Sequence, residues 1–287
     1  MAERRRTARP AAIPALVAIA GLAVGLLVLV PERLAPRDPA EQVIGARLLP
    51  PGARAGPLHF PLGSDDLGRD VLSRLVHGAR ISLAMGLAAV VLSVSLGVTS
   101  GLLAGYFGGP LERGIMRLAD VQMAFPFILL AIVVVGVLGP SPGKVVLVIG
   151  VGGWVHFARV VRSEVLSLRE RAFVEGARAT GAGDARILGR HLLPNVAPTV
   201  AVLAATTLAY AIVAESSLSF LGVGIPPSIP SWGAMLADGL QYVDTAWWLA
   251  TFPGLAILVT ALAASVLGDL LRDAGRPAGR RVAAGGG

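Results

Sequence analysis

Three acids lie in or beside long apolar stretches of the sequence: Asp120, Glu215 and Asp269. A carboxylate at membrane depth is costly, so such a residue is commonly paired or functional. Arg117 and Arg272 stand three residues from Asp120 and Asp269, which predicts an ion pair along one helix in each case. Glu215 has no basic residue nearby, so it could line a path or meet an arginine of another subunit. Between these roles and a structural one, we favour the structural role.

The histidines and cysteines do not predict a metal or redox centre. The four histidines are scattered and form no H-E-x-x-H pair. His156 follows Trp154 in an apolar stretch, where we expect a histidine satisfied within a helix bundle rather than a ligand. The absence of cysteine excludes a disulfide framework, a thiolate site and a cysteine nucleophile.

No catalytic motif is present either. The run GPSPGK at 139–144 lacks the four-residue interval of a phosphate-binding loop and the Ser or Thr that follows its lysine. The G-x-S-x-G elbow is also missing. We therefore expect no ATP site, no cofactor, no bound metal and no enzymatic activity in this chain.

Composition points to a membrane protein. Of 287 residues, 54% are hydrophobic and 15% are charged, against about 25% charged in soluble domains. The mean hydropathy is +0.72. The net charge of +7 comes from basic residues between apolar runs, which is typical of flanks of membrane spans rather than of a nucleic-acid-binding face.

Apolar runs long enough to cross a bilayer, about 20 residues each, occur six times. The first could instead be a secretory signal, but it exceeds the usual 7–15-residue core and no small-x-small cleavage site follows. We therefore expect an uncleaved span there. The fourth run is the shortest. The six expected spans are Ala11–Val30, Ile81–Phe107, Leu118–Leu138, Val145–Val161, Val196–Leu221 and Trp247–Leu271.

The distribution of basic residues predicts the orientation. With the N-terminus in the cytoplasm, 17 basic residues fall in cytoplasmic segments and eight fall outside. The positive-inside rule then places both termini in the cytoplasm. Residues 31–64, rich in proline, would form an extended extracytoplasmic connection, followed by a short helix over 70–80 that leads into the second span.

Glycines at four-residue intervals mark one face of the second expected span: Gly97, Gly101 and Gly105. Such a stripe lets another helix approach closely. It indicates either a tightly packed bundle around a path or ordinary helix packing, and we favour ordinary packing from this feature alone.

The segment 163–195 between the fourth and fifth spans is polar and too long for a turn. Helical spacing up to Ala179 is broken at Gly181 and Gly183, and Asp184 is a plausible N-cap for a second short helix that Pro194 would stop. We predict a helix–turn–helix at the cytoplasmic surface, held at both ends by spans and suited to transmit force.

This segment resembles the "EAA" loop of binding-protein-dependent permeases. The match consists of Glu175-Gly176-Ala177, Gly181 and Leu193-Pro194 at the family's spacing. Gly176 stands where the family usually has alanine. His191 stands where it usually has isoleucine, as in the peptide/nickel branch.

Further stretches resemble dipeptide and oligopeptide permeases, so the likeness covers about residues 59–277. They are HFPLGSDDLGRD at 59–70, ESSLSFLG at 215–222, PSWG at 230–233 and LGDLLRD at 267–273. Ser265 and the run GRP at 275–277 depart from the family's pattern, which puts only the contacts of the tail in doubt.

The resemblance implies an all-α membrane protein with six transmembrane helices and the type I ABC importer permease fold. Residues 1–79 would hold a cytoplasmic tail, the first span and an extracytoplasmic segment. Residues 80–271 would form the permease domain with the coupling loop 163–195, and 272–287 a cytoplasmic tail. The residues implied to contact an ATPase subunit are Glu175, Gly176, Ala177, Arg178, Ala179, Gly181, Ala182, Leu193 and Pro194.

By this likeness the chain is a permease subunit in the bacterial inner membrane. It would form a path with a second, homologous permease for peptides or related small solutes. Two ATPase subunits would drive it and an extracytoplasmic binding protein would deliver cargo.

Two alternatives remain open. A self-sufficient secondary carrier would be expected to show internal repeats, and none is visible. An intramembrane enzyme would need paired catalytic groups at depth, and none is evident.

Overall fold

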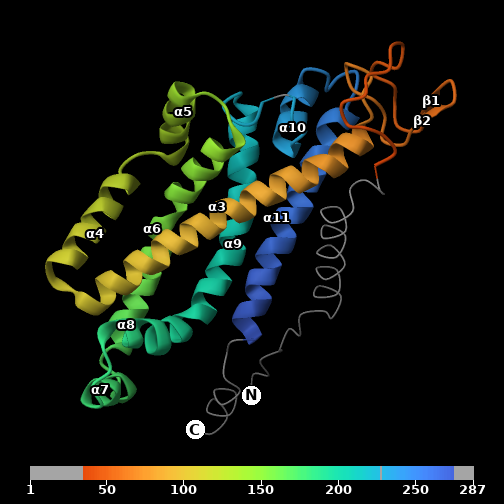
Figure 1. Cartoon of the computed structure of the whole chain (residues 1–287). Coiled ribbons are helices and arrows are strands. Elements are labelled where there is room, and N and C mark those ends of the chain that lie inside the picture. Colours follow the sequence, from red (N-terminus) through yellow and green to blue (C-terminus); the bar gives the residue numbers. More distant parts are fainter. Residues whose placement is uncertain (1–34, 227, 275–287) are drawn as a thin grey trace, which may run out of the picture.

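The computed structural model describes residues 35–226 and 228–274. The expected span Ala11–Val30 lies outside these residues. Within them the chain is a bundle of long helices with one small β-hairpin (Figure 1). The hairpin and the short helix α10 (Trp232–Leu240) lie at one end of the bundle, and α7 (Ala172–Ala179) lies at the opposite end.

The segment before the first long helix is folded rather than extended. Its strands β1 (Ala53–Ala55) and β2 (Leu58–Phe60) pair antiparallel. Buried Ser64 ties the segment together: its hydroxyl donates to the carbonyl of Ala46 and accepts from the Leu49 amide. Its carbonyl accepts a bond of 3.2 Å from the Trp248 indole.

An ion-pair network joins this segment to α10. Arg74 is buried and contacts the carboxylate of Asp65, which also pairs with Arg69 at 2.6 Å. A second nitrogen of Arg74 lies 3.8 Å from Asp238 on α10. Burial raises the pKa of the Asp238 carboxyl, whereas the guanidinium of Arg74 lowers it. The network holds the hairpin end together by charge as well as by packing.

Helix α3 (Val71–Phe107) is one continuous element of 37 residues, capped by the Asp70 carboxylate accepting from the Ser73 amide at 2.7 Å. At 1.5 Å per residue it is about 55 Å long, well beyond the roughly 30 Å hydrocarbon core. The helix expected over 70–80 is present, but it is the first part of α3 and not a short element of its own, because no residue between it and the span breaks the helix. The expected domain boundary at 79/80 falls inside α3.

The glycine stripe of α3 lies against α6 (Pro142–Leu168), and these two helices form the most extensive helix pair described. A Cβ atom on Gly101 would lie 2.7 Å from the carbonyl oxygen of Ala158, and one on Gly105 would lie 2.8 Å from the Cβ of Val165. A Cβ on Gly97 would overlap Phe157. All three glycines therefore allow close contact between the two helices.

The third expected span, Leu118–Leu138, is not one helix. Helix α4 (Gly109–Met123) and helix α5 (Phe127–Leu138) meet at an angle of 85°. Pro126 precedes α5 and lacks an amide hydrogen, and proline disfavours helical geometry at the residue before it, Phe125. A hydropathy pattern shows that this stretch is apolar, but it does not show that the helix breaks within it.

The remaining long helices are α9 (Leu193–Phe220) and α11 (Trp248–Ala274). Among the described residues, four helices are long and apolar enough to cross a membrane, or five if the bent pair α4–α5 counts as one span. A core cluster of buried residues joins α3, α5, α6 and α9; it includes Ala89, Val135, Val145 and Ala211.

Candidate functional site

Helix α7 projects from the bundle at the end away from the hairpin (Figure 1). Val174 is its one buried residue and packs with Ile187, Leu192 and Val165. Glu175, like most of the helix, is exposed. Most of the surface of this short helix is therefore exposed.

The turn after α7 depends on Gly181. Its φ is +81°, in the left-handed region that glycine adopts without strain. The amide of Gly181 donates to the Arg178 carbonyl at 2.9 Å, and the amide of Ala182 donates to the Ala177 carbonyl at 3.0 Å. This pair of bonds is a Schellman motif, which closes a helix on a glycine. Thr180 adds a hydroxyl bond to the Ala177 carbonyl at 2.9 Å.

Beyond the turn, α8 (Asp184–Arg186), the π-helical turn η1 (Ile187–Leu192) and α9 follow without a break. The expectation that Pro194 stops a helix is wrong: the helix continues past Pro194 in α9, which follows directly on the π-helical turn η1. The segment 184–220 therefore runs as one body from the α7 turn into the bundle.

Asp184 has a different role from the expected N-cap. Gly183 occupies the cap position, and the Asp184 carboxylate accepts a bond of 2.6 Å from the Tyr106 hydroxyl at the end of α3. The guanidinium of Arg178 lies 5.3 Å from the Tyr106 ring centre, within the range of a cation–π contact. The α7–α8 segment is thus tied to α3 as well as to α9.

A groove of about 540 Å³ runs beside α7. Gly176 and Ala177, which have little or no side chain, form part of its wall, and Leu193 and Pro194 are exposed nearby in sequence. Two basic side chains and His191 line the far side of the groove. Its lining residues are Phe173, Gly176, Ala177, Thr180, Ala182, Arg186, Arg190 and His191.

Two acids of α4 pair with arginines of α6. Asp120 pairs with Arg159 of α6 at 2.6 Å, so the expected pair with Arg117 is wrong. Glu112 of α4 pairs with Arg162, also on α6. Both links hold α4 against α6, because arginines of a neighbouring helix lie closer than the local one.

Glu215 is completely buried within the chain. One carboxylate oxygen accepts a bond of 2.8 Å from the Ser219 hydroxyl. Hydroxyls of Ser82 on α3 and Ser231 before α10 also face it. Glu215 therefore has the buried, hydroxyl-bonded surroundings of a structural residue, and its role beside a path or against another subunit stays a prediction. It lies where α3, α9 and the start of α10 meet.

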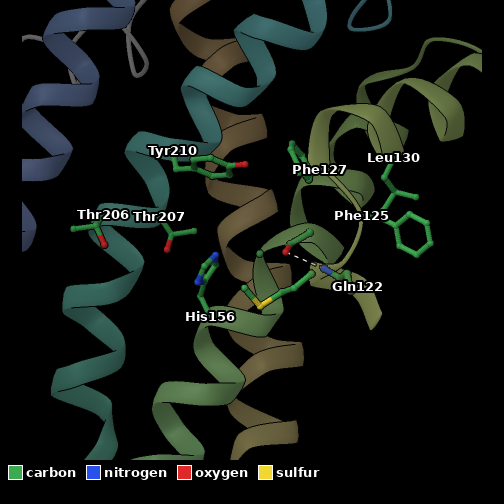
Figure 2. Close-up of a pocket in the computed structure, with 11 residues that line it drawn as sticks. Gln122, Phe125, Phe127, Leu130, His156, Thr206, Thr207 and Tyr210 are labelled. Carbon is green, nitrogen blue, oxygen red and sulfur yellow. Dashed lines mark hydrogen bonds between the residues drawn. The ribbon is translucent and has the colours of Figure 1, made fainter. Parts of the chain in front are cut away.

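His156 does not fit the expectation of a satisfied bundle residue. Its side chain is exposed, and within the described part of the chain it makes no hydrogen bond. It faces a pocket between α4–α5, α6 and α9 (Figure 2). The spacing of residues in the sequence did not predict that the His156 side chain would point into this pocket and not into the packed interior of the bundle.

A bundle of apolar helices with a small surface helix clamped to two of them is the arrangement expected of a membrane permease. Residues 97–278 match the protein family described as "Binding-protein-dependent transport system inner membrane component". The chain belongs to this family and is a permease subunit of a binding-protein-dependent ABC importer.

Similar proteins are permeases of the same kind. The di/tripeptide transport system permease DppC of Pseudomonas aeruginosa is 42% identical over 84% of this chain and 80% of its own length. The glutathione transport system permease GsiD of Pectobacterium atrosepticum is 46% identical over 74% of this chain and 71% of its own. The dipeptide permease DppC of Escherichia coli is 44% identical over 84% and 81%.

A solved structure shows the fold. An inward-facing form of the MetNI methionine ABC transporter matches with a TM-score of 0.55 at 21% identity, over 71% of this chain and 97% of that one. The expected all-α importer permease fold is confirmed. The number of six spans stays a prediction.

Proposed function

We propose that this permease subunit imports short peptides or related small solutes delivered by an extracytoplasmic binding protein. The identity of 42–46% to permeases named for dipeptide, tripeptide and glutathione transport supports this substrate class. The path forms between this chain and a second, homologous permease. The chain has no catalytic site of its own, and two ATPase subunits supply the energy.

The attachment of α7 carries the proposal. Its exposed face and the groove beside it receive an ATPase subunit, with Glu175 to Gly181 at the centre of the contact. Because α8 and η1 continue into α9, a displacement of α7 moves that span directly. The bond from Tyr106 to Asp184 passes the same displacement to α3. Two spans then shift together and open the path on alternate sides.

This mechanism requires α7 on the cytoplasmic side, with both chain termini. The sequence contains no cysteine, so single cysteines can be placed at exposed Ala179 and Ile44, at opposite ends of the bundle. In intact spheroplasts, we expect a membrane-impermeant maleimide to label Ile44→Cys and to label Ala179→Cys only after lysis. Labelling of Ala179→Cys from outside would rule out contact with a cytoplasmic ATPase.

Transport itself is tested on the complete transporter in proteoliposomes with its binding protein. We expect uptake of radiolabelled trialanine, dialanine or glutathione to require enclosed ATP. A catalytic-site variant of the ATPase subunit should remove uptake, and an ion gradient should not replace ATP. Ion-driven uptake by the single chain would instead establish a secondary carrier. Failure of all three substrates alongside uptake of another solute would overturn the peptide assignment.

A further inference from the structure

A pocket of about 330 Å³ opens where the break between α4 and α5 faces α6 and α9 (Figure 2). His156 lies near the middle of α6, and Thr207 near the middle of α9, so the pocket is at mid-depth of two spans. Its volume is at the lower end of the roughly 300–1,000 Å³ found for small-molecule sites. Its lining residues are Gln122, Met123, Phe125, Phe127, Leu130, Gly152, Gly153, His156, Thr206, Thr207 and Tyr210.

Two polar side chains in this pocket lack a hydrogen-bond partner among the described residues. His156 is exposed and Tyr210 is 50% exposed, and neither makes a hydrogen bond to any residue that the structure describes. A polar side chain at the middle of a span avoids lipid and commonly faces protein or a water-filled space. In Figure 2, His156 and Tyr210 both reach into the space between α9 and the α4–α5 break.

Gln122 has a different role because its amide is fully used. Its nitrogen donates to the carbonyls of Val151 and Gly152, at 2.9 and 3.0 Å, and its oxygen accepts from the Trp154 indole at 2.6 Å. Gln122 therefore fixes the end of α4 to α6 and leaves the break open beside it. Non-helical backbone at membrane depth is tolerated where it is buried in protein or lines a watery cavity.

The pocket lining holds no carboxylate, ammonium or guanidinium side chain. Asp, Glu, Lys and Arg are absent from its lining, which combines hydroxyl, imidazole and amide groups with aromatic and apolar walls. Neutral donors and acceptors match the amide groups that every peptide carries. Fixed charges would instead bind the charged side chains of some peptides and repel others. The lining thus suits a passage for peptides of varied sequence.

We propose that this pocket is this subunit's part of the translocation path, and that His156, Thr207 and Tyr210 contact the backbone amides of a peptide in transit. The inference rests on the proposed function, since it needs a peptide to pass. It adds the place of passage and the groups that meet the cargo.

The first test fills the pocket with Thr207→Trp in the complete transporter. We expect the initial rate of trialanine uptake in proteoliposomes to fall on the order of tenfold or more, while assembly with the other subunits is retained by size-exclusion chromatography. Leu258→Trp is the matched control, because Leu258 is exposed on α11 and does not line the pocket. The control should transport as the wild type does. Normal uptake by an assembled Thr207→Trp transporter would overturn the proposal.

A second test does not depend on a large side chain. Thr207→Cys changes little volume, and we expect a charged methanethiosulfonate reagent to modify it, with trialanine and binding protein slowing the modification. Leu258→Cys lies outside the pocket, so trialanine and binding protein should not slow its modification. An unreactive thiol in a Thr207→Cys transporter that still imports trialanine would refute this path while leaving the proposed function intact. Wild-type transporter that imports no peptide would instead refute the proposed function.

Discussion

Replacing Gly101 with leucine is expected to remove most of the folded protein from the membrane. A Cβ at this position would lie 2.7 Å from the Ala158 carbonyl oxygen and 2.8 Å from the Cβ of Val161. The first of these atoms belongs to the backbone of α6 and cannot rotate away. Overpacking a tight contact costs about 1–3 kcal/mol, and more where backbone must move. The pair α3–α6 is the most extensive in the bundle, so the whole fold bears that cost.

The measurement is the yield and melting temperature of the purified transporter in detergent. Gly114→Leu provides the control, because nothing lies within 4 Å of a Cβ atom built on Gly114 of α4. Leucine is also a better helix former than glycine by up to about 1 kcal/mol, so this control should be neutral or stabilising. Wild-type yield and melting temperature for Gly101→Leu would show that the two helices are not in close contact.

The sequence was sufficient to predict most of the apolar spans among the described residues and the glycine face, because both depend on local composition and spacing. The break in the third span could not be derived from hydropathy. Both sides of Pro126 are apolar, and a hydropathy window averages across a bend. The proline was the one local signal, and its effect depends on whether neighbouring helices support a kink or a turn of 85°.

Side-chain partners were harder to predict than elements. Asp120 had Arg117 at helical spacing, yet it pairs with Arg159 across to α6. Asp184 had the residue type of an N-cap, yet it accepts from Tyr106, far away in sequence. In both cases a tertiary contact replaced a local one of similar strength. Only the packing of α3, α4 and α6 decides between them.

The direction in which a polar side chain leaves a span decides its surroundings. This direction could not be predicted from the sequence. Glu215 and His156 both interrupt apolar runs. The structure buries Glu215 among serine hydroxyls and leaves His156 exposed to a pocket. The residue with the higher cost of burial is thus the buried one, because three elements meet around it and supply hydroxyl groups.

Gly181 is the position where local geometry and proposed function coincide. Its φ of +81° and its amide bond to Arg178 end α7 and set the angle at which that helix leaves the bundle. Only Val174 of α7 is buried, so changing this angle disturbs few apolar contacts. A variant here should alter the position of α7 and leave the spans in place.

Gly181→Pro is therefore expected to abolish ATP-driven uptake without preventing membrane insertion. Proline fixes φ near −65° and has no amide hydrogen, so it loses both the left-handed conformation and the hydrogen bond of the turn. Uptake of trialanine in proteoliposomes should fall to background. Gly189→Ala is the control, since Gly189 lies in η1 with no atom within 4 Å of an added Cβ and no positive φ. It should transport as the wild type does.

Glu175→Arg separates docking from folding. The Glu175 side chain is exposed and makes no hydrogen bond or ion pair to another described residue, so inverting its charge should not change the melting temperature. If α7 docks on an ATPase subunit, the new charge lies within the contact and should weaken both assembly and uptake. If Glu175→Arg and Gly181→Pro both lose uptake, the surface of α7 is required for transport, and not merely the stability of that helix. Full uptake by both would mean that force reaches α3 and α9 by another route.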